Sequence, residues 1–147
     1  MATSLTFTGT LFTSASVLIS ASQFTPITIA QGGTAGCRIY GISGQTNSTT
    51  ATGYFNLIYS SSAAGGTGIV LGTVPVSANA GNTTVASADL FGQSTVASVF
   101  QKQKDANGVP YFNVPGGAII QIKASGSVTT QMTSASTLNI VAFGEFY

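Results

Sequence analysis

The stretch Ile119-Ile120-Gln121-Ile122-Lys123-Ala124-Ser125 decides the fold class of this chain, because its apolar and polar side chains alternate. In an extended strand the apolar side chains would lie on one face and the polar ones on the other. The same period of two recurs around Val17 and Ile19 and again around Leu138 and Ile140. We therefore expect β-strands rather than helices.

Turn-rich segments separate these alternating runs. Glycine and asparagine, which tolerate left-handed backbone angles, cluster at residues 31–36, 79–82 and 115–117. Turns at this spacing are typical of a sandwich or a barrel. Strands are expected at residues 5–12, 16–21, 26–30, 37–42, 52–60, 68–76, 96–100, 109–114, 118–124 and 136–146. One helical turn is expected at residues 87–91, with Ser87 as its N-cap. We predict one all-β domain spanning residues 1–147.

Charged side chains are scarce in this chain. Only 5% of the residues are charged, with four Lys and Arg, three Asp and Glu, and no histidine, whereas a soluble domain usually carries about a quarter. A surface wetted by hydroxyls and amides suits contact with copies of itself or with a larger assembly. Asp89, Asp105 and Glu145 lie on separate predicted elements. We therefore expect a structural protein and not an enzyme, with no cofactor and no metal.

The sequence favours protein partners over membranes or nucleic acid. No apolar run approaches the ~20 residues that a transmembrane helix needs, and no basic run favours phosphate contacts. No basic residue precedes the first apolar run, so we expect no secretory signal peptide. The single cysteine, Cys37, excludes an intrachain disulfide, and its apolar neighbours predict a buried, unreactive thiol.

The most polar stretch is Gln101-Lys102-Gln103-Lys104-Asp105-Ala106-Asn107-Gly108. Asn-Gly after a strand is a strong turn signal, which favours a solvated hairpin tip. The alternative is that Lys102 and Lys104 contact an acidic surface of a partner.

Aromatic residues are frequent, with five tyrosines and nine phenylalanines. Most lie within predicted strands, which favours core packing over a platform for sugars. Phe143, Phe146 and Tyr147 fall in the last five residues, where an exposed aromatic cluster would be a liability. We therefore predict that this tail docks, either on its own sheet or on a neighbouring subunit.

The run Asn113-Val114-Pro115-Gly116-Gly117-Ala118-Ile119-Ile120-Gln121-Ile122-Lys123 combines a strand, a Pro-Gly turn and a second amphipathic strand. Together with Thr137-Leu138-Asn139-Ile140-Val141-Ala142-Phe143, it resembles the small all-β decoration (cement) and head-fibre proteins of tailed bacteriophages. This pairing is similar to the last strands of jelly-roll modules, including trimeric ones on virions and spore coats. The resemblance implies a jelly-roll-like β-sandwich, a tendency to form trimers and a place on a particle surface.

These observations lead to one main expectation about function. The chain is expected to be a virion structural protein, assembled in the host cytoplasm, that decorates a capsid and bridges its subunits. Its partners would be itself, as a homotrimer, and a major capsid or other virion protein. The alternative is a receptor- or glycan-binding fibre or tail module that uses loop tyrosines and asparagines such as Asn47, Asn79 and Asn82. A hydrolase is a third, disfavoured alternative because histidine is absent.

Overall fold

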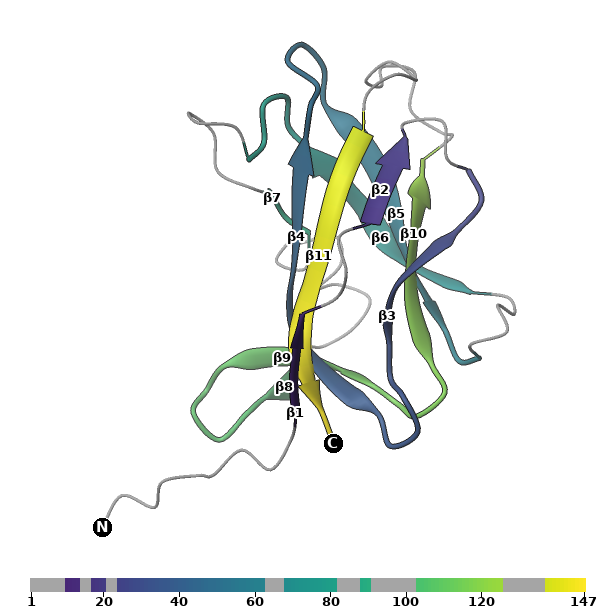
Figure 1. Cartoon of the computed structure of the whole chain (residues 1–147), viewed down its shortest axis with the longest axis vertical. Coiled ribbons are helices and arrows are strands. Elements are labelled where there is room, and N and C mark those ends of the chain that lie inside the picture. Colours follow the sequence, from purple (N-terminus) through teal and green to yellow (C-terminus); the bar gives the residue numbers. More distant parts are fainter. Residues whose placement is uncertain are drawn as a thin grey trace.

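The computed structural model describes residues 10–13, 17–20, 24–62, 68–81, 88–90, 103–125 and 137–147, and every regular element in these ranges is a β-strand. The strands are β1 (Thr10–Thr13), β2 (Val17–Ser20), β3 (Ile27–Gln31), β4 (Cys37–Thr46), β5 (Gly53–Ser60), β6 (Ile69–Val76), β7 (Ala88–Asp89), β8 (Gln103–Lys104), β9 (Pro110–Val114), β10 (Ile119–Ala124) and β11 (Thr137–Phe146). They form two layers, seen side by side in Figure 1.

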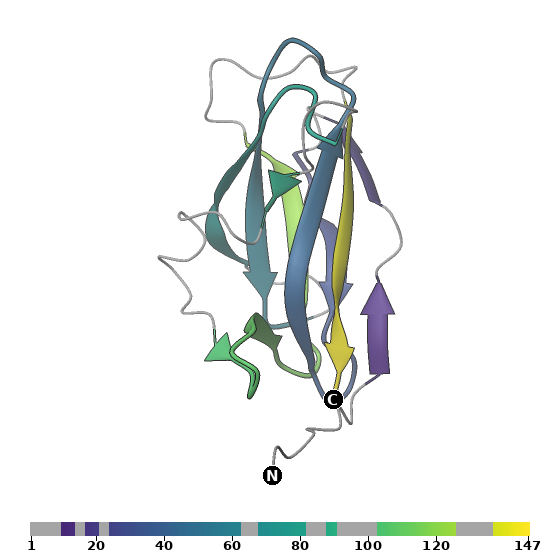
Figure 2. The same ribbon diagram turned by 90° about the vertical axis from the view of Figure 1, so that its left-hand side faces the viewer.

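Each layer is an antiparallel sheet. Sheet A has the strand order β1–β11–β4–β9–β8, with β2 also paired with β11 and β7 with β4. Sheet B has the order β3–β10–β5–β6. Figure 2 looks onto sheet A, with β4 and β11 side by side at its centre. The expected all-β antiparallel sandwich is therefore confirmed.

The pairing order is that of a jelly roll. The first strands, β1 and β2, pair with the last strand, β11. Moving inward along the chain, β3 pairs with β10, β4 with β9, and β5 with β6. The chain is thus paired from its outside inward, as if one long hairpin had been rolled up. Two sheets built in this way form a jelly roll, with β1 and β2 as two parts of its first strand.

The hydrophobic core lies between the two sheets. The alternation read from the sequence is confirmed on β11, where Leu138 and Ile140 are fully buried. On β10, Ile119 and Ile120 are both buried, and the ladder with β3 shifts register directly after Ile120. Buried residues of both sheets form one continuous hydrophobic cluster.

The helical turn predicted at residues 87–91 is wrong for the residues described there. Ala88 and Asp89 form β7 and pair with β4. Leu90 follows with a buried side chain, and its N–H donates to the carbonyl of Ile42 at 2.9 Å. The ladder offers backbone partners and a core site for Leu90, and together these outweigh one capped helical turn. The first and last residues of the range lie outside the described residues.

Other predicted boundaries differ from the structure at particular places. The strand predicted at residues 37–42 continues to Thr46, because β4 stays paired with β11 beyond the point where the alternation breaks. Strand β8 was not predicted. Its two residues pair with β9 at the edge of sheet A. The strand predicted at residues 96–100 lies outside the described residues, and that predicted at 5–12 lies mostly outside them.

A β-bulge in the central ladder explains why the alternation breaks. Along β11, Phe143 pairs with Gly41, but the next residue, Gly144, pairs with Ile39. Tyr40 is therefore the extra residue of β4 at this point. A side chain at position 144 would overlap the carbonyl oxygen of Arg38. The bulge thus requires glycine for close backbone approach.

We predict that Gly144→Ala destabilises the fold strongly, by about 3 kcal/mol or more, because backbone atoms must move to admit the methyl group. Gly108→Ala is the matched control, since nothing lies within 4 Å of its added Cβ and only the φ of 80° is strained. The control should cost about 1 kcal/mol. Urea unfolding of both variants tests this, and equal losses would contradict the prediction.

Cys37 begins β4 on the core side. Its exposed fraction is 0%, which confirms that it is buried, and its thiol donates weakly to the carbonyl of Gln31 at 3.6 Å. Burial raises the pKa of the Cys37 thiol to about 11. Both features oppose formation of a reactive thiolate at neutral pH.

We predict that a water-soluble disulfide reagent labels Cys37 in the folded protein orders of magnitude more slowly than in urea, because the native thiol is neither exposed nor ionised. The rate is followed by absorbance at pH 8. A native rate comparable with that of the unfolded chain would show the interpretation to be incorrect.

Candidate functional site

The chemically richest part of the described structure is the outer face of sheet A near the end of β11. Arg38 on β4 pairs with Glu145 on β11 and, on its other side, with Asn113 on β9. Because side chains alternate along a strand, these three residues share the face that points away from the core. The sequence had placed them far apart, and the jelly-roll order brings them together.

Arg38 is the centre of this group. Its Nη1 lies 3.2 Å from Oε1 of Glu145, and the side chains are 30% and 4% exposed, respectively. The guanidinium carbon lies 4.8 Å from the ring centroid of Tyr111 and 5.1 Å from that of Tyr147. An arginine placed in this way combines an ion pair with two cation–π contacts. We refer to Arg38, Asn113, Tyr111, Glu145 and Tyr147 as the Arg38 cluster.

Tyr147 is anchored by three hydrogen bonds. Its backbone N–H donates to the carbonyl of Gly36 at 3.1 Å, and its hydroxyl donates to Oδ1 of Asn113 at 2.5 Å. The same hydroxyl accepts from Nε of Arg38 at 3.3 Å. The hydrogen bond to Tyr147 raises the pKa of Arg38, with burial as an opposing effect, so Arg38 stays a cation.

Tyr40, the extra residue of the bulge, lies beside this cluster. Its ring meets that of Tyr111 edge-on, with centroids 6.2 Å apart, and burial raises the pKa of its hydroxyl. The Tyr40 hydroxyl and Oε2 of Glu145 are both buried without a hydrogen-bond partner among the described residues. A buried polar atom without a hydrogen-bond partner lowers the stability of the fold. The packing of neighbouring residues around the cluster therefore has to offset this cost.

The three aromatic residues of the predicted tail have different environments. Phe143 is 46% exposed on the outer face, where its ring covers Gly41. Phe146 is half-buried and packs inward against the core, whereas Tyr147 is 51% exposed on the outer face. Since Phe143 and Phe146 are part of β11, this segment lies within its own sheet.

The two lysines singled out in the sequence are not part of this cluster as described. Lys104 is exposed on β8, opposite Pro110, and Lys102 lies outside the described residues. The β8–β9 hairpin closes through Asp105, whose Oδ1 accepts from the N–H groups of Asn107 and Val109 at 2.9 and 2.8 Å. A hairpin thus occupies the predicted place; contact of the lysines with an acidic partner stays a prediction.

Sequence reasoning did not identify Arg38, Tyr40, Tyr111 or Glu145 as site residues. The available signal was the position of Arg38 and Glu145, charged residues in otherwise apolar strand runs. That signal becomes specific only when the strands are known to be neighbours.

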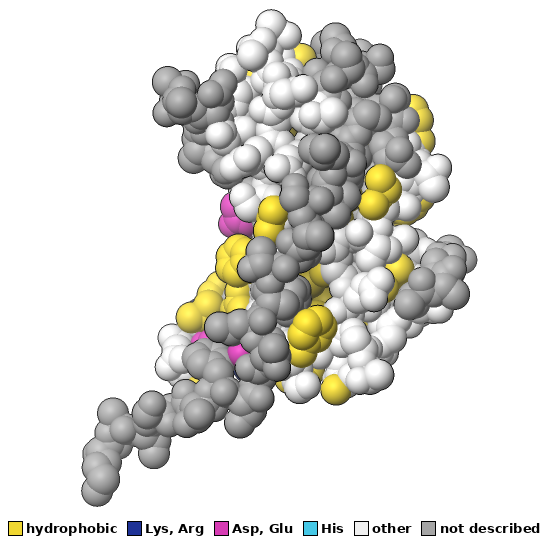
Figure 3. All heavy atoms as spheres, viewed as in Figure 1, with side chains coloured by type: hydrophobic (Ala, Val, Ile, Leu, Met, Phe, Trp, Pro, Cys, Tyr) yellow, Lys and Arg dark blue, Asp and Glu magenta, His cyan; other side chains and the backbone are white. Residues whose placement is uncertain are grey.

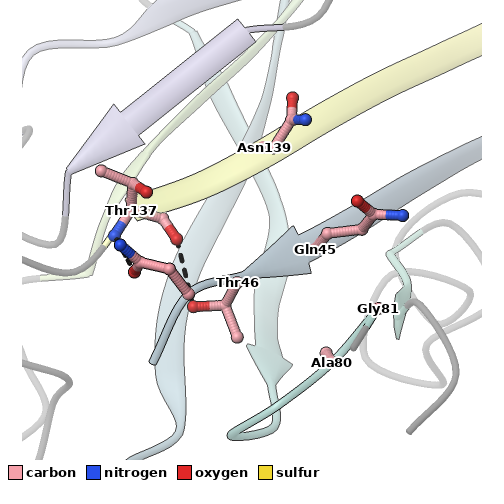
Figure 4. A pocket seen from close by; sticks show the side chains of 7 residues that line it. Gln45, Thr46, Ala80, Gly81, Thr137 and Asn139 are labelled. Atoms are coloured by element: carbon pink, nitrogen blue, oxygen red, sulfur yellow. Dashed lines mark hydrogen bonds between the residues drawn. The ribbon is translucent and has the colours of Figure 1, made fainter. Parts of the chain in front are cut away.

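A second feature lies further along the same strands. A hollow of about 270 Å³ is lined by Gln45, Thr46, Asn47, Ala80, Gly81, Thr137 and Asn139. In Figure 4 the amide side chains of Gln45 and Asn139 project from adjacent strands, β4 and β11. At its edge, Thr46 Oγ1 donates to the carbonyl of Thr137 at 3.1 Å, and the N–H of Thr137 donates to Oδ1 of Asn47 at 2.8 Å. This end of the face is therefore lined by amides and hydroxyls.

Hydrophobic side chains also gather on the part of the surface that carries sheet A, as Figure 3 shows. A surface that combines ring faces, amides and one neutralised ion pair is suited to binding a ligand.

Within the described ranges, no group of three or more His, Cys, Asp or Glu side chains could hold a metal ion. The same ranges contain no helix long and apolar enough to cross a bilayer. Comparison of the chain with family models, with curated proteins and with solved structures gives no match.

We predict that Arg38→Met destabilises the protein by about 2–4 kcal/mol, because it leaves the carboxylate of Glu145 buried without its cation. Adding Glu145→Gln should recover much of this loss, since the double variant removes the unpaired charge. Urea unfolding of the two single variants and the double variant gives the coupling. Additive losses in the double variant would show that the ion pair does not hold the cluster together.

Proposed function

We propose that this protein is a virion structural protein, a trimeric decoration subunit on the capsid of a tailed bacteriophage. The fold supports the proposal in a general way, since jelly rolls are frequent in viral capsid and lectin domains. A fold does not establish a function, so the proposal rests on a surface feature.

That feature is exposed apolar surface at both edges of sheet B. Ile69 and Val70, at the start of edge strand β6, are 55% and 47% exposed. Phe24, just before the opposite edge strand β3, is 57% exposed. An edge strand with uncharged, exposed apolar side chains is open to pairing or packing against another chain. In a chain with so few charges, these positions are the natural contacts between copies.

The position of the two apolar edges suggests how copies would associate. When one edge of a subunit packs against the opposite edge of the next, the contact is heterologous, and it closes into a ring if the rotation between copies is suitable. Three copies give the trimer of the proposal. A stable interface of 1,200–2,000 Å², at about 25 cal/mol per Å² of apolar area, leaves little need for ion pairs.

We predict that Ile69→Ser combined with Val70→Ser converts the oligomer to monomers and prevents attachment to capsids, because it removes apolar surface at one edge. Val109→Ser, in the β8–β9 turn, is the matched control; its side chain is also exposed, and it should associate normally. Sedimentation velocity measures the oligomer, and co-sedimentation with capsids that lack the protein measures attachment.

Raising salt from about 0.1 M to 1 M should change this association little, because screening acts on charges and both edges lack them. A monomeric wild type, normal assembly of the double variant, or release by salt would each contradict the proposed function.

A second candidate function is a glycan-binding module of a fibre or tail. The observation that favours it is the outer face of sheet A, where exposed rings and amide side chains lie on the same strands. This face does not overlap with the apolar edges of sheet B, so the two functions could coexist in one subunit.

A further inference from the structure

We propose that the outer face of β4 and β11 binds a neutral glycan chain that lies along the strands. The inference rests on the second candidate function and gives it a site and a ligand class. It does not depend on whether the protein decorates a capsid.

The site is a strip of cross-strand pairs. From one end to the other, Asn139 pairs with Gln45, Val141 with Ser43, Phe143 with Gly41, and Glu145 with Arg38. The residues between them on β11, such as Ile140, are buried in the core, so these pairs face outward. We call this surface, together with Tyr147, the β4–β11 strip.

Two exposed rings stand on this strip. Phe143 lies over Gly41, and Tyr147 lies beyond Glu145 on the same face. The face of an aromatic ring carries partial negative charge, which attracts the C–H groups on the apolar face of a sugar ring. Tyr147 follows Phe143 by four residues, and each residue of an extended strand advances the chain by about 3.3 Å. The two rings are therefore separated by more than the length of one sugar unit. The spacing therefore fits an extended chain rather than a monosaccharide.

Amides and hydroxyls stand beside and beyond the rings. Asn113 is exposed next to Tyr147, and Gln45 and Asn139 border the hollow at the other end. An amide side chain has two donors and an acceptor with two lone pairs, so it can bond to sugar hydroxyls while keeping a contact within the protein. A few polar groups around an apolar surface are the usual means of fixing a ligand's orientation.

The charges on the strip favour an uncharged ligand. Arg38 and Glu145 neutralise each other at 3.2 Å. At the border, exposed Asp89 pairs with Ser43 in the ladder of β7. Arg38, the cation among the described residues of the strip, is already paired with Glu145, so an acidic sugar gains no further charge partner there.

The ring of Tyr147 is held in place before any ligand binds. The hydroxyl of Tyr147 is bound by both Arg38 and Asn113, and its ring packs against the guanidinium. A side chain that is already ordered loses little entropy on binding. The strip is therefore a prepared surface rather than one that has to form around its ligand.

The experiment is a glycan array probed with the full-length protein. The array carries neutral gluco-, galacto- and manno-configured oligosaccharides of four to eight units, together with sialylated and uronic-acid oligosaccharides. We expect binding to a neutral oligosaccharide, increasing with chain length, and none to the acidic set. The best-bound glycan is then titrated by calorimetry against the variants.

Phe143→Ala should weaken binding by about tenfold, a typical effect of losing one stacked ring. Val109→Ala is the control, because it shortens an apolar side chain of similar exposed fraction (44% against 46% for Phe143) outside both the strip and the edges of sheet B, and its affinity should be that of the wild type. Thermal unfolding of both variants shows whether the folded state is retained. Tyr147→Phe, which keeps the ring and removes only the hydroxyl, should reduce affinity less than Phe143→Ala.

Three results would overturn the inference. One is an array without binding to any neutral oligosaccharide, and another is binding to the acidic set alone. The third is dissociation of the oligomer by Phe143→Ala, which would show that a second copy of the chain occupies the strip. The Ile69 and Val70 double variant separates these failures from failure of the capsid proposal, since its edge lies on the other sheet and its affinity per glycan site, measured by calorimetry, should be unchanged.

Discussion

The pairing of β11 with β4 is the constraint on which the rest of the structure depends. The ladder runs from Leu138 opposite Thr46 to Phe146 opposite Cys37, and each strand also holds further strands on its free side. Among the described strands, this ladder is therefore what connects β1 and β2 with β9 in sheet A. The inward residues of the ladder contribute much of the core, and its outward residues form the strip. In a jelly roll the last strand lies between the first and the third. Here β11 lies between β4, which is the third strand, and β1 and β2, which together are the first.

The bulge within the ladder determines what the outer face displays. On β11, alternation continues unbroken through Phe143, Glu145 and Tyr147 on the outer side. On β4, the extra residue Tyr40 changes which positions face outward, so that Arg38 comes to lie opposite Glu145. If Tyr40 were instead paired regularly with Gly144, Arg38 would lie opposite Phe146 and its guanidinium would point toward the core, where an unpaired charge is very costly. The bulge thus makes the ion pair, the two ring contacts on Arg38 and the anchoring of Tyr147 possible together.

The sequence was sufficient for the parts of the fold that depend on local alternation. Strands β10 and β11 were predicted closely, because Ile120, Ile122 and Leu138 follow a period of two. The bulge at Tyr40 broke that period, and the strand predicted to end at residue 42 was therefore too short. The segment around Leu90 was misassigned for a different reason, since pairing with β4 outweighed its capping signal. The Arg38 cluster depends on contacts between residues more than a hundred positions apart in the chain, and no local pattern contains that information.

The scarcity of charge gives the surface of this protein a consistent character. Where Arg38 and Glu145 do occur, they neutralise each other, and the apolar edges of sheet B carry no charge at all. Long-range electrostatic steering is then weak, so association depends on shape and on the removal of apolar surface from water. A surface of this kind favours partners that are held close by, such as neighbouring subunits or a repeating glycan, because many weak contacts add through effective concentration. The two proposed surfaces lie on different sheets, so multivalency created by assembly at one would strengthen binding at the other.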